Sequence, residues 1–147
     1  MSRMYLVGKI SATDNKGVLE VSSHIEKQKS YCDPVVFISI TPYGSEGISM
    51  KMSNYELRSL SHELLRIYST GGEFERRSGG KGPLCTLRIK GGETYGEFLL
   101  LREGNTVRVS VKLVDIFGFS KEIAALCDAT SDALFKTQRM IDNKKAK

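Results

Sequence analysis

A short stretch in which a strand runs directly into a helix, residues 48–68, constrains the fold most strongly. Ile48, Met50 and Met52 alternate with polar residues, which is the period of a strand with one buried face. Ser53 follows with Glu56 three positions later, the pattern of a helix-capping box. The next apolar residues recur at the spacing of one helix face: Tyr55, Leu57, Leu60, Leu64, Ile67 and Tyr68. The stretch therefore predicts a strand that enters a helix without a long loop.

The same order returns in the second half of the chain. A strand pattern occupies 107–113, and a helical pattern begins at about Asp115. Lys51 and Lys112 take corresponding positions in the two strands. Apolar and small residues then continue at helical spacing: Ile116, Phe119, Ile123, Leu126, Thr130, Ala133 and Thr137, with Leu134 and Phe135 beside them. We interpret the chain as two copies of one unit.

Three further strands precede the strand-to-helix stretch in each half. They are predicted at 4–10, 18–26 and 35–41, and again at 73–77, 84–90 and 94–101, between turns rich in glycine and proline. The prediction is an α+β fold with ββββα twice, in one domain of two pseudo-repeats at about 4–70 and 73–138. A frayed basic tail is expected at 140–147. No low-complexity linker separates the halves, and a half of this size would be only marginally stable alone.

Composition narrows the function classes. A chain of 147 residues can bury a core without a metal or a disulfide. Cys32, Cys85 and Cys127 are far apart and odd in number, so neither a disulfide framework nor a CxxC metal site is indicated. The first apolar run is interrupted by Gly8 and Lys9 and is too short for a signal peptide or a membrane span. We expect an intracellular protein of the cytoplasm, nucleoid or nucleus that does not bind membranes.

Linear motifs of enzymes are missing from the sequence. His24 and His62 are the only histidines, and GxSxG, HExxH and a two-metal carboxylate cluster are absent. Cys85 and Cys127 are interpreted as small core hydrophobes. The sequence thus predicts a non-catalytic protein with no cofactor and no metal. An enzyme remains the alternative, because carboxylates without a linear motif could meet in space: Glu73, Glu75, Glu97 and Glu103.

The charge distribution points to the faces of the strands. The net charge is +5, and residues 71–114 carry eight Lys/Arg against five Asp/Glu. If the apolar residues of each strand face the core, the alternate residues face outward. In the first strand we expect Lys9 to share its face with Tyr5 and Val7. We also expect carboxylates to be scarce on the outward set, which is Tyr5, Lys9, Phe37, Lys51, Arg88, Lys90, Arg108 and Lys112.

Cations interleaved with an aromatic ring on an open sheet suit single-stranded nucleic acid. Ammonium and guanidinium groups follow the phosphates, and ring faces accept unstacked bases. One alternative is an ordinary solvated sheet face, where Lys and Arg are common. A second alternative places Phe37 in the core, if both faces of its sheet are covered.

The loop RRSGGKG at 76–82 adds Arg76, Arg77 and Lys81 beside residues without bulk, so its backbone can approach phosphates closely. It is not a Walker loop, because Gly82 stands where that motif needs Ser or Thr. A flexible solvated hairpin is the alternative interpretation.

The duplicated ββββα order, the strand that enters a helix and the basic sheet face together resemble a superfamily of single-stranded DNA-binding regulators. This superfamily includes the Whirly proteins, the Pur-alpha repeat proteins and the transcriptional positive cofactor family. The resemblance is one of architecture over about residues 4–138, with GKGPLCTLRIK the nearest passage to a Whirly signature string. It implies two antiparallel four-stranded sheets with helices packed on one side, and an extended strand bound by strand edges and outer faces. It also implies little sequence preference and assembly through helices; for the 116–135 helix, packing within one chain is the alternative.

Two functional hypotheses follow. The first is a single-stranded nucleic-acid-binding protein, with DNA favoured over RNA, that works in replication, repair or transcription as a homo-oligomer. Its expected binding residues are Lys9, Phe37, Lys51, Arg76, Arg77, Lys81, Arg88, Lys90, Arg108 and Lys112. The second is a protein-interaction or assembly module whose basic sheet face meets an acidic protein.

Overall fold

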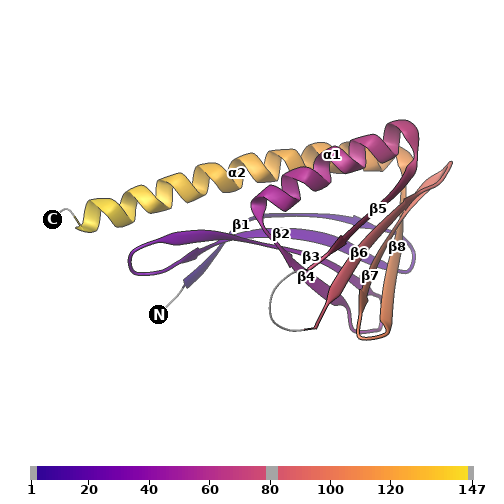
Figure 1. The fold of residues 1–147 in the computed structure, drawn as a ribbon, viewed down its shortest axis with the longest axis horizontal. Coiled ribbons are helices and arrows are strands. Elements are labelled where there is room, and N and C mark those ends of the chain that lie inside the picture. The colour runs from indigo at the N-terminus through magenta and orange to yellow at the C-terminus, as the bar shows by residue number, and fades with distance from the viewer. Residues whose placement is uncertain (1–2, 79–82, 146–147) are drawn as a thin grey trace.

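The computed structural model describes residues 3–78 and 83–145 of the chain. It contains two four-stranded antiparallel sheets and two helices in the order ββββαββββα (Figure 1). Sheet A and its helix comprise β1 Arg3–Thr13, β2 Gly17–Lys27, β3 Cys32–Pro42, β4 Ile48–Met52 and α1 Asn54–Thr70. Sheet B and its helix comprise β5 Gly72–Arg77, β6 Cys85–Gly91, β7 Tyr95–Arg102, β8 Asn105–Lys112 and α2 Leu113–Lys145. The α+β class and the duplicated order are confirmed.

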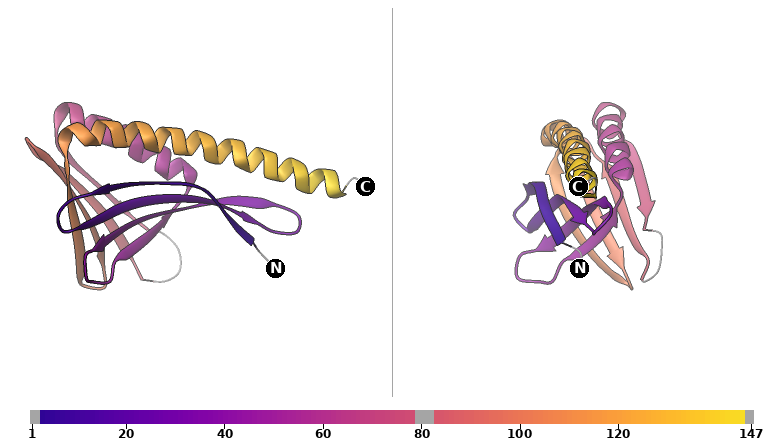
Figure 2. Two further views of the ribbon diagram at one scale, coloured as in Figure 1. Left: turned by 180° about the vertical axis from the view of Figure 1, so that it is seen from behind. Right: turned by 90° about the vertical axis from the view of Figure 1, so that its left-hand side faces the viewer.

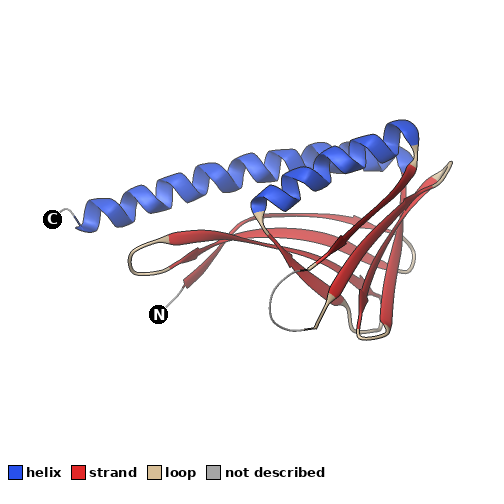
Figure 3. Ribbon diagram, viewed as in Figure 1, coloured by secondary structure: helices blue, strands red, loops and turns tan. Residues whose placement is uncertain are grey.

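Each sheet is a simple meander, because its strands pair in the order in which they occur in the chain. The two helices lie together on one side of the molecule (Figure 3). Sheet A runs beneath α2, and sheet B stands steeply inclined to it at one end (Figure 2). The outer face of each sheet, turned away from the helices, is thus left uncovered by them.

Helix α1 begins and ends as its sequence predicts. The Ser53 hydroxyl accepts the Glu56 N–H at 3.0 Å, and Oε1 of Glu56 accepts the Ser53 N–H at 3.2 Å, which completes the capping box. At the other end Gly71, with φ of 73°, donates its N–H to the carbonyl of Ile67 at 2.8 Å. The buried residues are Leu57, Leu60, Ser61, Leu64 and Ile67.

The two tyrosines assigned to this buried face lie elsewhere. Tyr55 is 88% exposed, because it lies two residues before Leu57 and therefore about 200° around the helix from it. Tyr68 is 39% exposed and stacks at an angle on Phe117 of α2, with the ring centroids 5.3 Å apart. The prediction that Tyr55 joins the apolar face is wrong, and Tyr68 contributes to the contact between the helices.

One hydrophobic core runs through both units. The inner faces of sheet A and sheet B and one side of each helix belong to the same cluster, which includes Val21, Ile38, Met50, Leu60, Leu87, Phe98, Val109 and Ile123. Helix α2 passes so close to β7 at Gly96 that a side chain there would overlap Ile116. The two halves are therefore packed as one fold.

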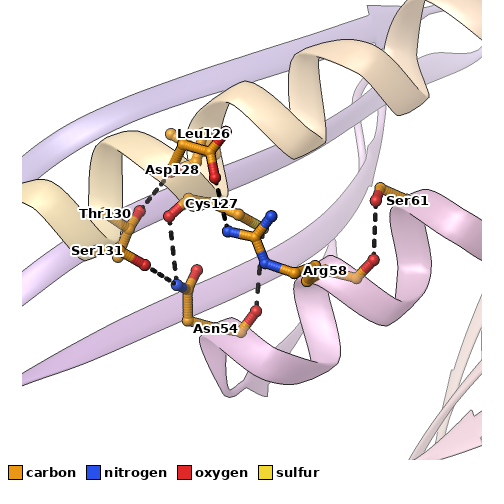
Figure 4. Close-up of polar contacts among 8 residues, drawn as sticks. All are labelled: Asn54, Arg58, Ser61, Leu126, Cys127, Asp128, Thr130 and Ser131. Atoms are coloured by element: carbon orange, nitrogen blue, oxygen red, sulfur yellow. Dashed lines mark hydrogen bonds and ion pairs between the residues drawn. The ribbon is translucent and has the colours of Figure 1, made fainter.

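Helices α1 and α2 run antiparallel and are joined by polar contacts (Figure 4). Arg58 pairs with Asp128 at 2.8 Å, and the amide of Asn54 donates to the carbonyl of Cys127 at 3.3 Å and the hydroxyl of Ser131 at 3.2 Å. Two buried hydroxyls donate to backbone carbonyls of their own helices, Ser61 to Arg58 and Thr130 to Leu126, and Thr130 also shares a hydrogen bond of 2.6 Å with Ser23 of β2. The contacts of Asn54 and Arg58 fix the register of the two helices.

Beyond Ser131, helix α2 continues past the start of α1 and over the far end of sheet A (Figure 1). Ile141 is 3% exposed and packs with Ile25 and Cys32. Where a frayed tail is predicted from 140, helix α2 continues to Lys145, because Ile141 meets the sheet and holds the last turns in place. Residues 146–147 lie outside the described residues.

Candidate nucleic-acid interface

Four residues form one row across the outer face of sheet A. Lys9 lies opposite Ser22, Ser22 opposite Phe37, and Phe37 opposite Lys51, so the row crosses all four strands. Both lysines are exposed, and within residues 3–78 and 83–145 neither forms an ion pair. We call these four residues the sheet A row. It places an aromatic ring between two free cations.

Phe37 lies on the outer face and is not a member of the main core cluster. It is half-buried, with the ring of His24 packed edge-on against it at a centroid distance of 5.9 Å. Its neighbour Val36 on the same strand is fully buried on the opposite face. The ring is thus held in place while part of it stays accessible to solvent.

A β-bulge changes the facing of β1. Leu6 pairs with His24 and Gly8 pairs with Ser23, so Val7 is an extra residue on β1. Before the bulge, Tyr5 lies opposite the buried Ile25 and is on the helix side of the sheet. The prediction that Lys9 shares a face with Tyr5 and Val7 is therefore wrong, since the bulge interrupts the alternation on which it depended.

The outer face of sheet B carries both signs of charge. Glu75 pairs with Arg88 at 3.2 Å and with Arg77 at 3.3 Å, and Glu73 lies 3.9 Å from Lys90. The hydrogen bond from Arg88 is the largest effect on the pKa of Glu75, and together with the hydrogen bond from Arg77 and the charges of both arginines it outweighs desolvation and lowers that pKa. The expected scarcity of carboxylates on this face is wrong. Periodicity assigned Arg88 and Lys90 to this face correctly, but cross-strand register places Glu75 opposite Arg88 and Glu73 opposite Lys90.

Arg76 is not part of an outer face. It lies opposite Leu87, on the helix side of β5, where Nη1 is 3.3 Å from Glu56 and Nη2 is 3.3 Å from the hydroxyl of Ser59. Its guanidinium also lies over the ring of Phe74 at 5.6 Å from the centroid. Arg76 therefore joins β5 to α1, and its assignment to a phosphate-binding loop is wrong. Lys81, predicted in the same loop, lies outside the described residues.

A second cluster of cations lines a cavity of about 590 Å³ where the β1–β2 turn meets β7 and β8. Lys16, Arg108 and Lys112 face it together with Tyr95, which is 49% exposed. Carboxylates are present as well, from Asp14, Glu97 and Asp115. We call this space the junction cavity, because residues of both sheets line it.

The carboxylate of Asp14 is fully engaged in this cavity. Oδ1 accepts the N–H groups of Lys16 at 2.7 Å and Gly17 at 2.9 Å, and Oδ2 accepts the N–H of Ser110 at 2.9 Å. Desolvation alone would raise the pKa of Asp14, but these backbone hydrogen bonds and the charge of Lys16 outweigh it and lower the pKa. Among the described residues, Lys16, Arg108 and Lys112 form no ion pair.

Lys51 and Lys112 occupy matching positions in the two units but lie on different surfaces. Lys51 belongs to the sheet A row, whereas Lys112 lines the junction cavity. The turn at 14–17 that closes this cavity belongs to the first unit and packs on the second. Sequence periodicity missed Lys16 and Tyr95, because it assigns the faces of a strand and does not say which distant turn meets that face.

Other chemistries find no support in the described parts of the chain. All three cysteines are free and buried, and burial raises the pKa of each thiol. Within these same residues no group of three or more His, Cys, Asp or Glu side chains is placed to hold a metal ion. Neither helix, over the part that is described, is both long and apolar enough to cross a membrane.

In comparisons with known proteins, no family model, curated protein or solved structure matches the chain. The functional argument therefore depends on the side chains and their arrangement.

Proposed function

We propose that the protein is a non-catalytic binding protein for single-stranded nucleic acid, in the first place DNA, with a role in replication, repair or transcription. The sheet A row carries this proposal. Lys9 and Lys51 are free to neutralise phosphates, and Phe37 between them offers a ring on which a base can stack. The only other member of the row is the hydroxyl of Ser22, so the row favours binding with little preference for base sequence.

The dimensions of the row suit a short run of nucleotides. Lys9 and Lys51 are three strand spacings apart, which amounts to about 14 Å at about 4.8 Å per spacing. A stacked strand rises about 3.4 Å along its axis for each phosphate, so about four nucleotides cover this distance. One strand crossing the sheet can therefore contact both lysines while a base between them reaches Phe37.

Half-burial of Phe37 favours a single strand over a duplex. A ring seated in a sheet can stack only on a base whose own face is free, and the bases of a duplex have both faces covered by their neighbours. The face of sheet A also presents no helix that could enter a groove. We therefore expect duplex DNA to bind more weakly than a single strand of the same length.

We also propose that copies of the protein assemble through their helices. Phe135 is 75% exposed, Val114 68% and Met140 58%, all on α2. Contact with a second copy of the chain would remove these apolar side chains from water. Tyr55 on α1, at 88% exposure, adds an aromatic side chain to the exposed part of the helical layer.

The second candidate function is a protein-interaction module. The alternating charges of Glu73, Glu75, Arg88 and Lys90 on sheet B favour it, because a mixed-charge face suits a protein surface better than a phosphate backbone. Fluorescence anisotropy separates the two functions, with labelled oligo-dT, a duplex of equal length and oligo-U titrated at about 50 and about 200 mM salt. Tight binding of oligo-dT that weakens steeply with salt supports the first function. Absence of binding at low salt would instead support a protein partner.

A further inference from the structure

A second basic surface lies at the end of the molecule where both chain termini emerge (Figure 1). There the start of β1, the β2–β3 turn and the end of α2 enclose a cavity of about 380 Å³. Its lining residues are Arg3, Tyr5, Lys27, Gln28, Lys29 and Lys144, and we call it the terminal groove. An adjoining cavity of about 340 Å³ shares four of these residues and adds Ile141 and Lys145.

Among the residues that the structure describes, the terminal groove is lined by four cations and by no carboxylate. Over residues 3–78 and 83–145, none of Arg3, Lys27, Lys29 and Lys144 takes part in an ion pair. The nearest carboxylates on the adjoining segments accept hydrogen bonds from amides, Glu26 from Gln28 at 3.4 Å and Asp142 from Gln138 at 3.0 Å. The four cations are thus gathered on one surface without a direct ion pair, an arrangement that suits an anionic ligand.

The backbone around these cations is fixed by contacts that reach from α2 to the turn. Gln138 donates to the carbonyl of Ser30 at 3.4 Å and accepts the N–H of Cys32 at 3.1 Å. Lys145 also donates to the carbonyl of Ser30, at 3.2 Å. Ile141 is buried beside these contacts, so the β2–β3 turn and the end of α2 are fixed relative to each other. The terminal groove is therefore formed before any ligand binds.

Tyr5 adds a ring to this basic surface. It is 46% exposed, and the bulge at Val7 places it on the helix side of β1, whereas Lys9 after the bulge lies on the outer face. β1 is the edge strand of sheet A, so nothing in that sheet pairs with its other side. Tyr5 in the terminal groove and Lys9 in the sheet A row are thus four residues apart on this edge strand. At about 3.3 Å per residue, this separation is about 13 Å.

We propose that the terminal groove binds the phosphodiester backbone of the same single strand that crosses the sheet A row. The strand passes over the β1 edge, its phosphates contact Lys27, Lys29 and Lys144, and a base stacks on Tyr5. This proposal rests on the proposed function and extends it, because it predicts a binding site longer than the sheet face alone. Short oligonucleotides fill only the sheet A row, and longer ones also fill the groove.

The test compares wild-type protein, K29Q/K144Q and the control K121Q/K136Q with oligo-dT of about 8 and about 30 nucleotides. Lys29 and Lys144 are exposed, as are Lys121 and Lys136 on α2, so both double variants remove the same charge from solvent-exposed positions. For the long oligonucleotide we expect K29Q/K144Q to lower the slope of log K against log salt by about 1.4, since each phosphate contact contributes about 0.7. Its binding to the short oligonucleotide should equal that of the control. Y5S should weaken only the long complex, by about fivefold or more.

The two oligonucleotide lengths distinguish a failure of the groove proposal from a failure of the proposed function. If wild-type protein binds both lengths and K29Q/K144Q matches the control with each, the groove proposal is overturned and the proposed function stands. If wild-type protein binds neither length, both are overturned. If K29Q/K144Q leaves the long complex unchanged but abolishes sedimentation with phosphatidylserine vesicles, the groove binds a lipid surface, and the proposal is likewise overturned.

Discussion

Asp14, in the first turn of the chain, accepts the backbone N–H of Ser110 on β8 at 2.9 Å. β8 is an edge strand of sheet B, and this contact satisfies an N–H that has no strand to pair with on that side. The same carboxylate closes its own turn by accepting the N–H groups of Lys16 and Gly17. One side chain therefore shapes the β1–β2 turn, joins it to the second unit and places Lys16 beside Arg108 and Lys112.

Asp14→Asn should destabilise the fold at neutral pH by about 1–2 kcal/mol, because an amide NH₂ cannot accept the Ser110 N–H. The pKa of Asp14 is lowered in the folded protein, so its stabilisation is fully present above the ordinary carboxyl pKa of about 4. That stabilisation is lost as pH falls through the lower folded pKa. Urea unfolding of wild type and variant should therefore differ at pH 7 and converge at strongly acidic pH. Asn15→Ala, an exposed change in the same turn, is the control, and a difference that does not depend on pH would contradict this account.

Ile141→Ala should lower the free energy of unfolding by about 2–4 kcal/mol, because the side chain is buried against Ile25 and Cys32. The neighbouring Met140 is 58% exposed, so Met140→Ala should cost less than about 0.5 kcal/mol. Denaturant titration measures both, and hydrogen exchange should show amide protection over 132–145 lost only in Ile141→Ala. Equal effects of the two variants would mean that the last turns of α2 do not pack on sheet A.

R88Q/K90Q should reduce binding of oligo-dT far less than a double change in the sheet A row does. Glu75 and Glu73 already neutralise these two cations, and breaking exposed ion pairs changes stability by about 0–1 kcal/mol. We expect the slope of log K against log salt to change by less than about 0.5. A fall of the size expected for two phosphate contacts would place the nucleic acid on sheet B instead.

Phe135→Glu should weaken self-association about tenfold or more without changing the melting temperature, because the ring is 75% exposed and contributes little to the core of one chain. Light scattering coupled to size exclusion, over a range of protein concentrations, measures the change. Ala129→Glu, at another exposed position of α2, is the matched control. A wild-type protein that is monomeric at all concentrations would contradict assembly through this helix.

Most of the fold follows from local patterns. The alternation at Ile48, Met50 and Met52, the capping box of Ser53 and Glu56, and the glycine at the end of α1 all have the structure that their sequence predicts. The wrong predictions concern segments whose structure depends on contacts with residues far away in the sequence. The bulge at Val7 reverses a face of β1, and Ile141 is ordered by a sheet more than a hundred residues away in sequence. The hydrophobic periodicity of each segment does not reveal these features.

The candidate site could be predicted only in part, for the same reason. Alternation placed Lys9, Phe37 and Lys51 on outer strand faces, and antiparallel register then aligned them in one row. Alternation placed Arg88 outward just as well, but the pairing of β5 with β6 brings Glu75 beside it. Whether an outward cation is free or paired depends on cross-strand register, which hydrophobic period alone does not specify.

The most direct test of the central claim is the salt dependence of oligo-dT binding by K9Q/K51Q and by Phe37→Leu. Removing two phosphate contacts should lower the slope of log K against log salt by about 1.4 relative to wild type and to the control K121Q/K136Q. Phe37→Leu keeps an apolar side chain against His24 but removes the ring, so it should weaken binding about fivefold or more with the slope unchanged. If both variants bind oligo-dT with the wild-type affinity and slope while remaining folded, the sheet A row does not bind nucleic acid and the account is contradicted.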